Sequence, residues 1–274
     1  MPRAECAALA LAALLAAPAP PPRYTAPQLD CARFGERARS DIRTSVGGRD
    51  RHETAGEDAR WQVRATPAGD SVRVQAWLDS LTVWRTSPEG TLRPDTDGLI
   101  GGRYRGTLAP NGRYRAEARP FVPDEVGAVV DLGRAFDDLL PRLPPVPLAV
   151  GQSWSDSAGL EIRRLPDTSV AAGELLLRFR LIEQRDVTEV TPQGDSVPIP
   201  VRQSSREEGS FVWHPREGLV RRDRQVTVET SIPSGGRIRR AVRSRVEQRI
   251  VLERLSGAAA CPTRTAAPDR TAAP

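Results

Sequence analysis

The chain has 274 residues, of which 39% are hydrophobic and 27% are charged. This composition excludes a collagen-like, coiled-coil or fully disordered chain, and also a multi-pass membrane protein. Its 40 basic and 35 acidic residues leave a net charge of +5, and apart from two histidines every basic residue is arginine. The length accommodates one large β domain or two small ones.

The N-terminus has the pattern of an export signal. Arg3 precedes an unbroken run of small and apolar residues from Cys6 to Ala17, which is shorter than the roughly 20 residues that span a bilayer. We therefore expect a signal peptide over 1–19, a Pro-rich leader over 20–30, and a periplasmic or secreted protein with no integral membrane span. The alternative is a short N-terminal helix that stays attached.

Removal of this signal would leave two cysteines, Cys31 and Cys261. An even pair in an exported chain predicts a disulfide between them, and two free thiols are the alternative. The tail over 262–274 is rich in Ala, Thr and Pro without an apolar period, so we expect it to be disordered.

Period-two alternation dominates the chain between these ends. Over 236–255, apolar residues fall on even positions such as Val242, Val246 and Ile250, while arginines and glutamates fall on odd ones. A strand places the two sets on opposite faces, one dry and one wet. The same alternation recurs over 37–46, 72–84, 175–181 and 226–232.

Turn signals separate these segments. The apolar set of 72–84 changes register at Asp79-Ser80, which predicts a bulge or bend. Three Gly-containing turns predict hairpins: Pro67-Ala68-Gly69-Asp70, Pro110-Asn111-Gly112 and Pro215-Arg216-Glu217-Gly218.

One segment reads as a helix. Val122-Pro123-Asp124-Glu125 has proline and acids in a first turn, and apolar residues follow at helical spacing until Pro141. The members of that apolar set are Val126, Val129, Val130, Gly133, Phe136 and Leu140. An extended linker is expected over 143–151, where three further prolines stand.

The two halves of the chain, about 36–141 and 150–255, echo each other at an offset of about 100 residues, which favours a duplicated β unit. The alternative is that two β meanders resemble each other. We predict a single β-rich domain over 31–261, of mainly β (α+β) class. It is a curved antiparallel sheet or half-barrel, with one main helix on its dry concave face.

No catalytic set is apparent, and we expect no cofactor and no metal site. His52-Glu53 lacks the second histidine of a zinc motif and is expected in a solvated loop. Asp95-Thr96-Asp97 lacks the later ligands of a calcium loop, and Asp137-Asp138 is expected on a solvated surface. His214, at a hairpin turn, is the candidate for a hydrolase site if it meets Ser or Asp.

The arginine-rich segment 236–255 raises the question of nucleic acid. Glu247 and Glu253 interrupt the basic row, and no aromatic residues interleave it. We therefore predict a solvated face that also discourages edge pairing, and no nucleic-acid partner. The five tryptophans are expected in the core or at its rim.

The run from Leu143 to Trp154, with its Val150-Gly151-Gln152-Ser153-Trp154 turn, resembles a recurring feature of uncharacterised exported bacterial proteins of a domain of unknown function. The predicted architecture also resembles the half-barrel of the LolA/LprG-like periplasmic lipoprotein carriers. That resemblance implies acyl chains held between a curved sheet and helices, and it implies no catalytic residues.

We thus expect a non-enzymatic envelope protein that binds a lipophilic or amphipathic ligand, such as a lipid, or another envelope component. The ligand-binding residues are not identified by the sequence. A purely structural β module and a hydrolase using His214 are the alternatives.

Overall fold

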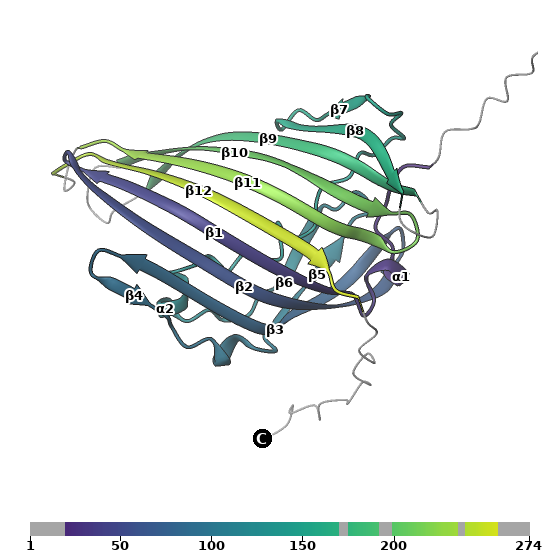
Figure 1. The fold of residues 1–274 in the computed structure, drawn as a ribbon, viewed down its shortest axis with the longest axis horizontal. Helices are drawn as coiled ribbons and strands as arrows, with labels where there is room; N and C mark the ends of the chain where they lie inside the picture. Colours follow the sequence, from purple (N-terminus) through teal and green to yellow (C-terminus); the bar gives the residue numbers. More distant parts are fainter. Residues whose placement is uncertain (1–19, 170–174, 192–198, 235–238, 257–274) are drawn as a thin grey trace, which may run out of the picture.

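The computed structural model describes residues 20–169, 175–191, 199–234 and 239–256 (Figure 1). The predicted signal peptide over 1–19, the tail over 262–274 and Cys261 lie outside the described residues.

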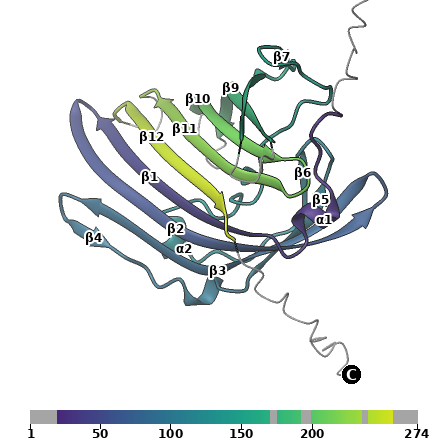
Figure 2. The ribbon, with the colours of Figure 1, turned by 45° about the vertical axis from the view of Figure 1, so that its right-hand side comes forward.

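Twelve antiparallel strands form one continuous sheet. It bends into a trough, so that β5 and β6 at one edge lie behind β1 and β12 in Figure 1 (see also Figure 2). The sheet order is β6-β5-β3-β2-β1-β12-β11-β10-β9-β8-β7, with β4 beside β3. The strands are β1 Arg33–Val46, β2 Arg49–Ala68, β3 Ser71–Ser87, β4 Gly90–Leu92, β5 Arg103–Leu108, β6 Tyr114–Ala118, β7 Ser153–Ser155, β8 Leu160–Ser169, β9 Leu175–Thr191, β10 Ile199–His214, β11 Gly218–Ile232 and β12 Val242–Arg254. The prediction of a mainly β, curved antiparallel sheet is confirmed.

The first and last long strands pair in the middle of the sheet. β1 and β12 are antiparallel, with Phe34 opposite Arg254 and Val46 opposite Val242. In the first predicted half, successive strands run from β1 at this seam outward to β6 at one edge. In the second half they run from β7 at the other edge inward to β12 at the seam, so both halves progress across the sheet in the same direction. Duplication of a β unit stays a prediction.

The alternating pattern sets which face each strand buries. In β2, Trp61, Val63 and Ala65 are buried while the residues between them are not. In β3 the apolar set shifts by one residue, because Arg60 pairs with Ser80 whereas Trp61 pairs with Leu78. The β-bulge predicted at Asp79-Ser80 is therefore confirmed, and it keeps both parts of β3 facing the core.

The three predicted hairpins join β2 to β3, β5 to β6 and β10 to β11. Each turn uses a glycine at positive φ, and Gly112 (φ 82°) shows why. A Cβ atom there would lie 2.5 Å from the Pro141 carbonyl oxygen, so the close approach of the 141–143 segment requires glycine.

The predicted main helix over 122–140 is wrong. Its helical part is limited to α2, Asp124–Gly127, and the other α-helix of the described residues is α1, Ala26–Leu29. Gly127 and the β-branched pair Val129-Val130 are poor helix formers. The Asp131 carboxylate accepts a hydrogen bond from the Gly133 backbone N–H at 3.0 Å, which favours a turn over a helix.

The segment nevertheless packs against the sheet. Val126, Leu132 and Phe136 are buried, and Phe136 lies beside Trp61 and Tyr104 with ring centroids 6.1 and 6.3 Å apart. This space, where the carrier resemblance implies bound acyl chains, is filled by side chains.

Part of the predicted leader over 20–30 also belongs to the core. Tyr24 and Leu29 are buried, and the Tyr24 hydroxyl donates a hydrogen bond to the Pro141 carbonyl at 3.0 Å. Tyr24 packs edge-on against Trp213, so the N-terminal segment closes the end of the trough where β10 turns into β11.

Candidate binding site

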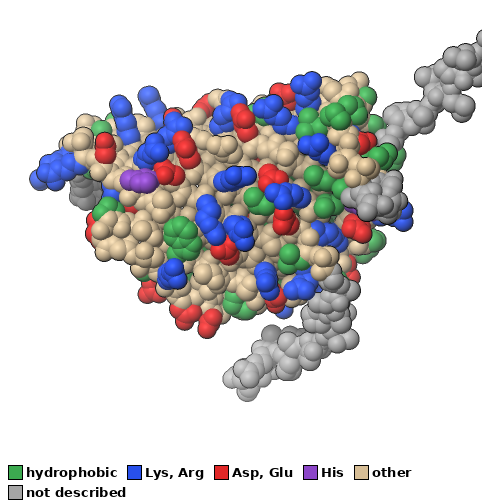
Figure 3. Space-filling model, viewed as in Figure 1, with side chains coloured by type: hydrophobic (Ala, Val, Ile, Leu, Met, Phe, Trp, Pro, Cys, Tyr) green, Lys and Arg blue, Asp and Glu red, His purple; other side chains and the backbone are tan. Residues whose placement is uncertain are grey.

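The outer face of the sheet, opposite the packed core, carries arginines interspersed with acids (Figure 3). Arg221 pairs with Asp223 at 2.7 Å and Arg245 with Glu229 at 2.8 Å, both between exposed or half-exposed side chains. Such surface pairs contribute about 0–1 kcal/mol each. The outer face is therefore exposed to solvent, as the alternation in β12 predicts, and its arginine charges are balanced by neighbouring acids.

The inner face bears a hollow of about 510 Å³ near the open end of the trough, which we call the inner hollow. Two exposed apolar side chains lie in it, Val46 at 40% and Leu92 at 49%. The inner hollow is lined by Thr44, Val46, Arg49, Arg51, Glu53, Arg85, Ser87, Gly90, Leu92 and Ala128. It combines exposed apolar groups with three guanidinium groups.

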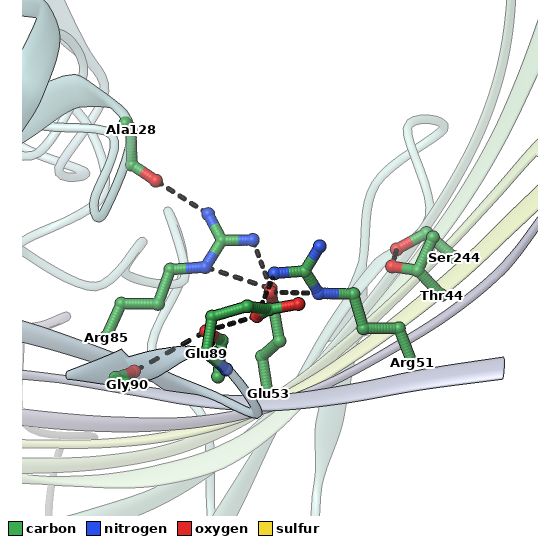
Figure 4. A network of polar contacts seen from close by, with 9 residues as sticks. Thr44, Arg51, Glu53, Arg85, Glu89, Gly90, Ala128 and Ser244 are labelled. Carbon is green, nitrogen blue, oxygen red and sulfur yellow. Dashed lines mark hydrogen bonds and ion pairs between the residues drawn. The ribbon is translucent and has the colours of Figure 1, made fainter. Parts of the chain in front are cut away.

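An ion-pair network forms the charged wall of the inner hollow (Figure 4). Glu53, whose side chain is 6% exposed, is held by Arg51 at 2.7 Å and by the Arg85 Nε atom at 2.9 Å. Arg85 also donates to the Ala128 carbonyl at 2.8 Å, and Arg51 pairs with Glu89 at 2.7 Å. Three elements thus fix the positions of these arginines.

The β1–β2 register divides the inner face into an apolar and a charged side. Opposite residues of an antiparallel pair share a face, and Ile42 lies opposite Glu53, Thr44 opposite Arg51, and Val46 opposite Arg49. On the other side of β1, the inward-facing residues of β12 and β11 include further apolar side chains. We call this set the aliphatic strip, and it comprises Ile42, Val46, Val228, Ile232, Val242 and Val246. The inner hollow lies on the boundary.

A buried charge cluster lies nearer the closed end. Glu207 on β10 binds Arg222 at 2.7 Å and Arg224 at 2.6 Å, and all three side chains are at most 12% exposed. Burial opposes ionisation of Glu207, but attraction and hydrogen bonds from both arginines outweigh it and lower its pKa to about 2. Arg222 also donates to the Leu139 carbonyl at 3.1 Å, which anchors the segment after α2.

A pair of buried glutamates lies across β1 and β2. The Glu36 carboxylate accepts a hydrogen bond from the Trp61 indole N–H at 2.8 Å. Glu57 is buried, and its Oε1 atom has no hydrogen-bond partner among the described residues. Burial, followed by repulsion from Glu36 and Asp58, holds the pKa of Glu57 well above its ordinary value. Glu57 is therefore a buried acid that favours its neutral form.

We expect Glu57→Gln to flatten the dependence of stability on pH. Because the folded-state pKa of Glu57 is raised above the ordinary 4.5, its contribution is intact below pH 4.5. That contribution is lost as pH rises through the folded-state value, since the unfolded chain releases the proton first. Urea unfolding at pH 5 and pH 8 should show wild type losing more stability than the variant.

Between pH 5 and pH 8, the free energy of unfolding of wild type should fall by at least about 1 kcal/mol more than that of the variant. This is the scale of an uncompensated buried polar group. Glu253→Gln, at an exposed ion pair of the outer face, serves as the control and should keep the wild-type pH profile. An unchanged profile in Glu57→Gln would show that the buried carboxyl is ionised in the folded protein.

His214 lies at the end of β10 and is buried. Its Nδ1 atom accepts hydrogen bonds from the backbone N–H groups of Arg216 and Glu217, at 3.3 and 3.0 Å. This geometry stabilises the β10–β11 turn, and a hydrolase role for His214 stays a prediction.

The other histidine is not in the loop that we predicted. His52 lies within β2, where this segment pairs with β1 and His52 is opposite Arg43. Its side chain is 59% exposed, and the His52 Nε2 atom lies 2.6 Å from an Asp41 oxygen on the outer face. His52 is thus solvated, as expected, although in a strand.

The paired acids serve local structure. Asp95 accepts a hydrogen bond from the Asp97 N–H at 2.9 Å, and the buried Thr96 hydroxyl donates to the Leu81 carbonyl at 2.7 Å. Asp137 pairs with Arg119. Over the described ranges, no group of three His, Cys, Asp or Glu side chains is placed to hold a metal ion, and no helix there has the length and apolarity to cross a bilayer.

The sequence did not single out the residues of the inner hollow. Placing His52 in a loop hid the face that Arg49, Arg51 and Glu53 share, because this polar run has no apolar–polar alternation to mark it as a strand. Leu92 follows a turn and stands in a three-residue strand, which is too short for a periodic pattern.

Comparison with known proteins gives two weak structural likenesses. No family model matches the chain, and no curated protein matches it. A structure titled "Lipid-protein interactions in lipovitellin" aligns with 82% of this chain and 25% of that one, at 9% identity and a TM-score of 0.46. A DUF1329 family protein from Desulfovibrio piger aligns over 80% and 84% at 10% identity and a TM-score of 0.16. Neither likeness bears on what this chain binds.

Proposed function

We propose that this chain is a non-enzymatic binding protein that holds an amphipathic molecule in the inner hollow. The observation that carries this proposal is the pair of exposed apolar side chains, Val46 and Leu92, beside fixed guanidinium groups in one hollow. A soluble surface seldom keeps such apolar groups together without a partner. An acyl chain would cover them and extend along the aliphatic strip.

The filled core supports a ligand position at the open end of the trough. Trp61, Tyr104 and Phe136 occupy the closed end, so we propose that the ligand lies over the inner face of β1, β4 and β12. The resemblance to lipoprotein carriers is compatible with such a ligand, although the described residues hold no long helix to cover it.

We also propose that the protein is exported, on the strength of the apolar run from Cys6 to Ala17. A Cys31–Cys261 disulfide is part of this proposal. The Leu255 N–H donates to the Arg33 carbonyl at 2.9 Å, which brings the end of β12 beside the residues that follow Cys31. Peptide mapping without reduction is expected to yield the linked pair, and two free thiols in oxidised exported protein would contradict it.

Calorimetric titration tests the binding proposal with two ligands that share a headgroup. Dodecyl phosphate, kept below its micellar concentration, should bind at least tenfold more tightly than butyl phosphate, because burial of each methylene contributes up to about 0.8 kcal/mol. Equal affinity for the two would contradict a chain-binding site.

Substitutions locate the site in the same assay. Val46→Asn and Leu92→Asn should each weaken dodecyl phosphate at least tenfold. Val187→Asn is the matched control, since Val187 is 43% exposed but lies on β9 outside the inner hollow, and it should bind within twofold of wild type. If the two hollow variants bind as wild type does, the inner hollow is not the site.

A further inference from the structure

We infer that the inner hollow selects amphipathic molecules with an anionic headgroup, such as a phosphate or carboxylate. This inference rests on the proposed function and adds the chemistry of the headgroup. The inner hollow and its charged wall contain three guanidinium groups, those of Arg49, Arg51 and Arg85, and two carboxylates, those of Glu53 and Glu89. The arrangement therefore retains one positive charge.

Arg85 uses all three of its guanidinium nitrogens on Glu53 and the Ala128 carbonyl, so Arg51 is the paired arginine that is preorganised for an anion. Arg51 is held through its Nε and Nη2 atoms, so its Nη1 amino group forms no ion pair within the part of the chain that the structure describes. A guanidinium offers five N–H donors and binds phosphate or carboxylate in a fixed fork geometry. Because Glu53 and Glu89 already order the side chain, little entropy is lost when an anion binds.

Arg49 supplies the surplus charge next to the apolar surface. It is exposed, forms no ion pair among the described residues, and lies directly opposite Val46. Cβ atoms of such opposed residues are about 4.5–5.5 Å apart. A headgroup at Arg49 and Arg51 therefore places the first methylenes of its chain on Val46, at the start of the aliphatic strip.

A zwitterionic headgroup fits this wall poorly. Its positive terminus would lie among three guanidinium groups, with Glu53 and Glu89 already engaged in ion pairs. A neutral sugar headgroup would leave the surplus charge unpaired. The charge of the wall thus favours the anion over both.

Titration with ligands of equal chain length tests this inference. Dodecyl phosphate should bind at least tenfold more tightly than dodecylphosphocholine or dodecyl maltoside at low salt, and the preference should shrink as salt screens it. Arg49→Gln should weaken dodecyl phosphate up to about fivefold, the scale of one exposed ion pair, and leave dodecyl maltoside unchanged.

Arg243→Gln removes the same charge from an exposed site on the outer-face row of β12 and should leave both affinities within twofold. Equal binding of all three dodecyl ligands would overturn the headgroup inference while the chain-length dependence keeps the proposed function. Absence of binding by every ligand would overturn both.

Discussion

Glu207→Gln is expected to destabilise the protein by about 3–5 kcal/mol. The amide keeps the shape of the side chain but removes the negative charge that Arg222 and Arg224 share. Both arginines are largely buried, and breaking a buried ion pair leaves an uncompensated charge in a region of low polarisability. Chemical unfolding at pH 7, followed by circular dichroism, measures the loss.

Its neighbour Glu208 provides the control. Glu208 points to the outer face and pairs with Arg180 and Arg206 at half-exposed positions, so Glu208→Gln should cost no more than about 1 kcal/mol. If Glu207→Gln does not fold, the triple variant that also carries Arg222→Met and Arg224→Met should recover folding, because it leaves no buried guanidinium without its carboxylate. A cost for Glu207→Gln no larger than that of Glu208→Gln would refute the buried cluster.

The same cluster predicts acid sensitivity. The pKa of Glu207 is lowered to about 2 in the folded protein, from an ordinary value of 4.5. Its stabilising contribution is therefore present above pH 4.5 and is lost as pH falls toward 2. Wild type should lose stability over that range, whereas Glu207→Gln should lose less.

Trp61→Ala is the second large expected effect, with a cost of about 3–5 kcal/mol. Trp61 is completely buried and packs against Tyr104 with ring centroids 5.3 Å apart. The substitution opens a cavity under the segment after α2 and removes the hydrogen bond to Glu36. Urea unfolding should show a lower midpoint with an unchanged slope.

Trp84→Ala is the matched comparison. Trp84 lies half-buried on the outer face, over the backbone of Gly56, where its removal leaves a solvent-filled notch and no closed cavity. We expect a cost below about 2 kcal/mol, in keeping with partial burial. A smaller cost for Trp61→Ala than for Trp84→Ala would mean that the core is not organised around Trp61.

The strands were predictable because their determinants are local. Alternation in β3 and β12 predicted which residues face the core, and its change of register predicted the bulge at Asp79-Ser80. The three glycine turns predicted the hairpins. The β1–β12 seam was not predictable, because it pairs residues about 200 positions apart and no local pattern specifies a distant partner.

The prediction of a main helix over 122–140 was wrong for a physical reason. A helical spacing of Val126, Phe136 and Leu140 shows only that these residues face the same way, and a turn-rich segment that follows the sheet achieves the same burial. The inner hollow could not be predicted from the sequence, because it depends on the register between strands. Val46 and Arg49 are separated by a turn of two glycines and become neighbours only through pairing.

Photo-labelling tests the central claim, ligand binding in the inner hollow, most directly. A dodecyl phosphate with a diazirine in the middle of its chain is bound, irradiated and mapped by peptide mass spectrometry, with unfolded protein as the background. We predict labels on peptides that contain Val46, Leu92 or the aliphatic strip, and competition by unlabelled dodecyl phosphate. Labelling confined to outer-face residues such as Trp84, or equal in folded and unfolded protein, would contradict the account.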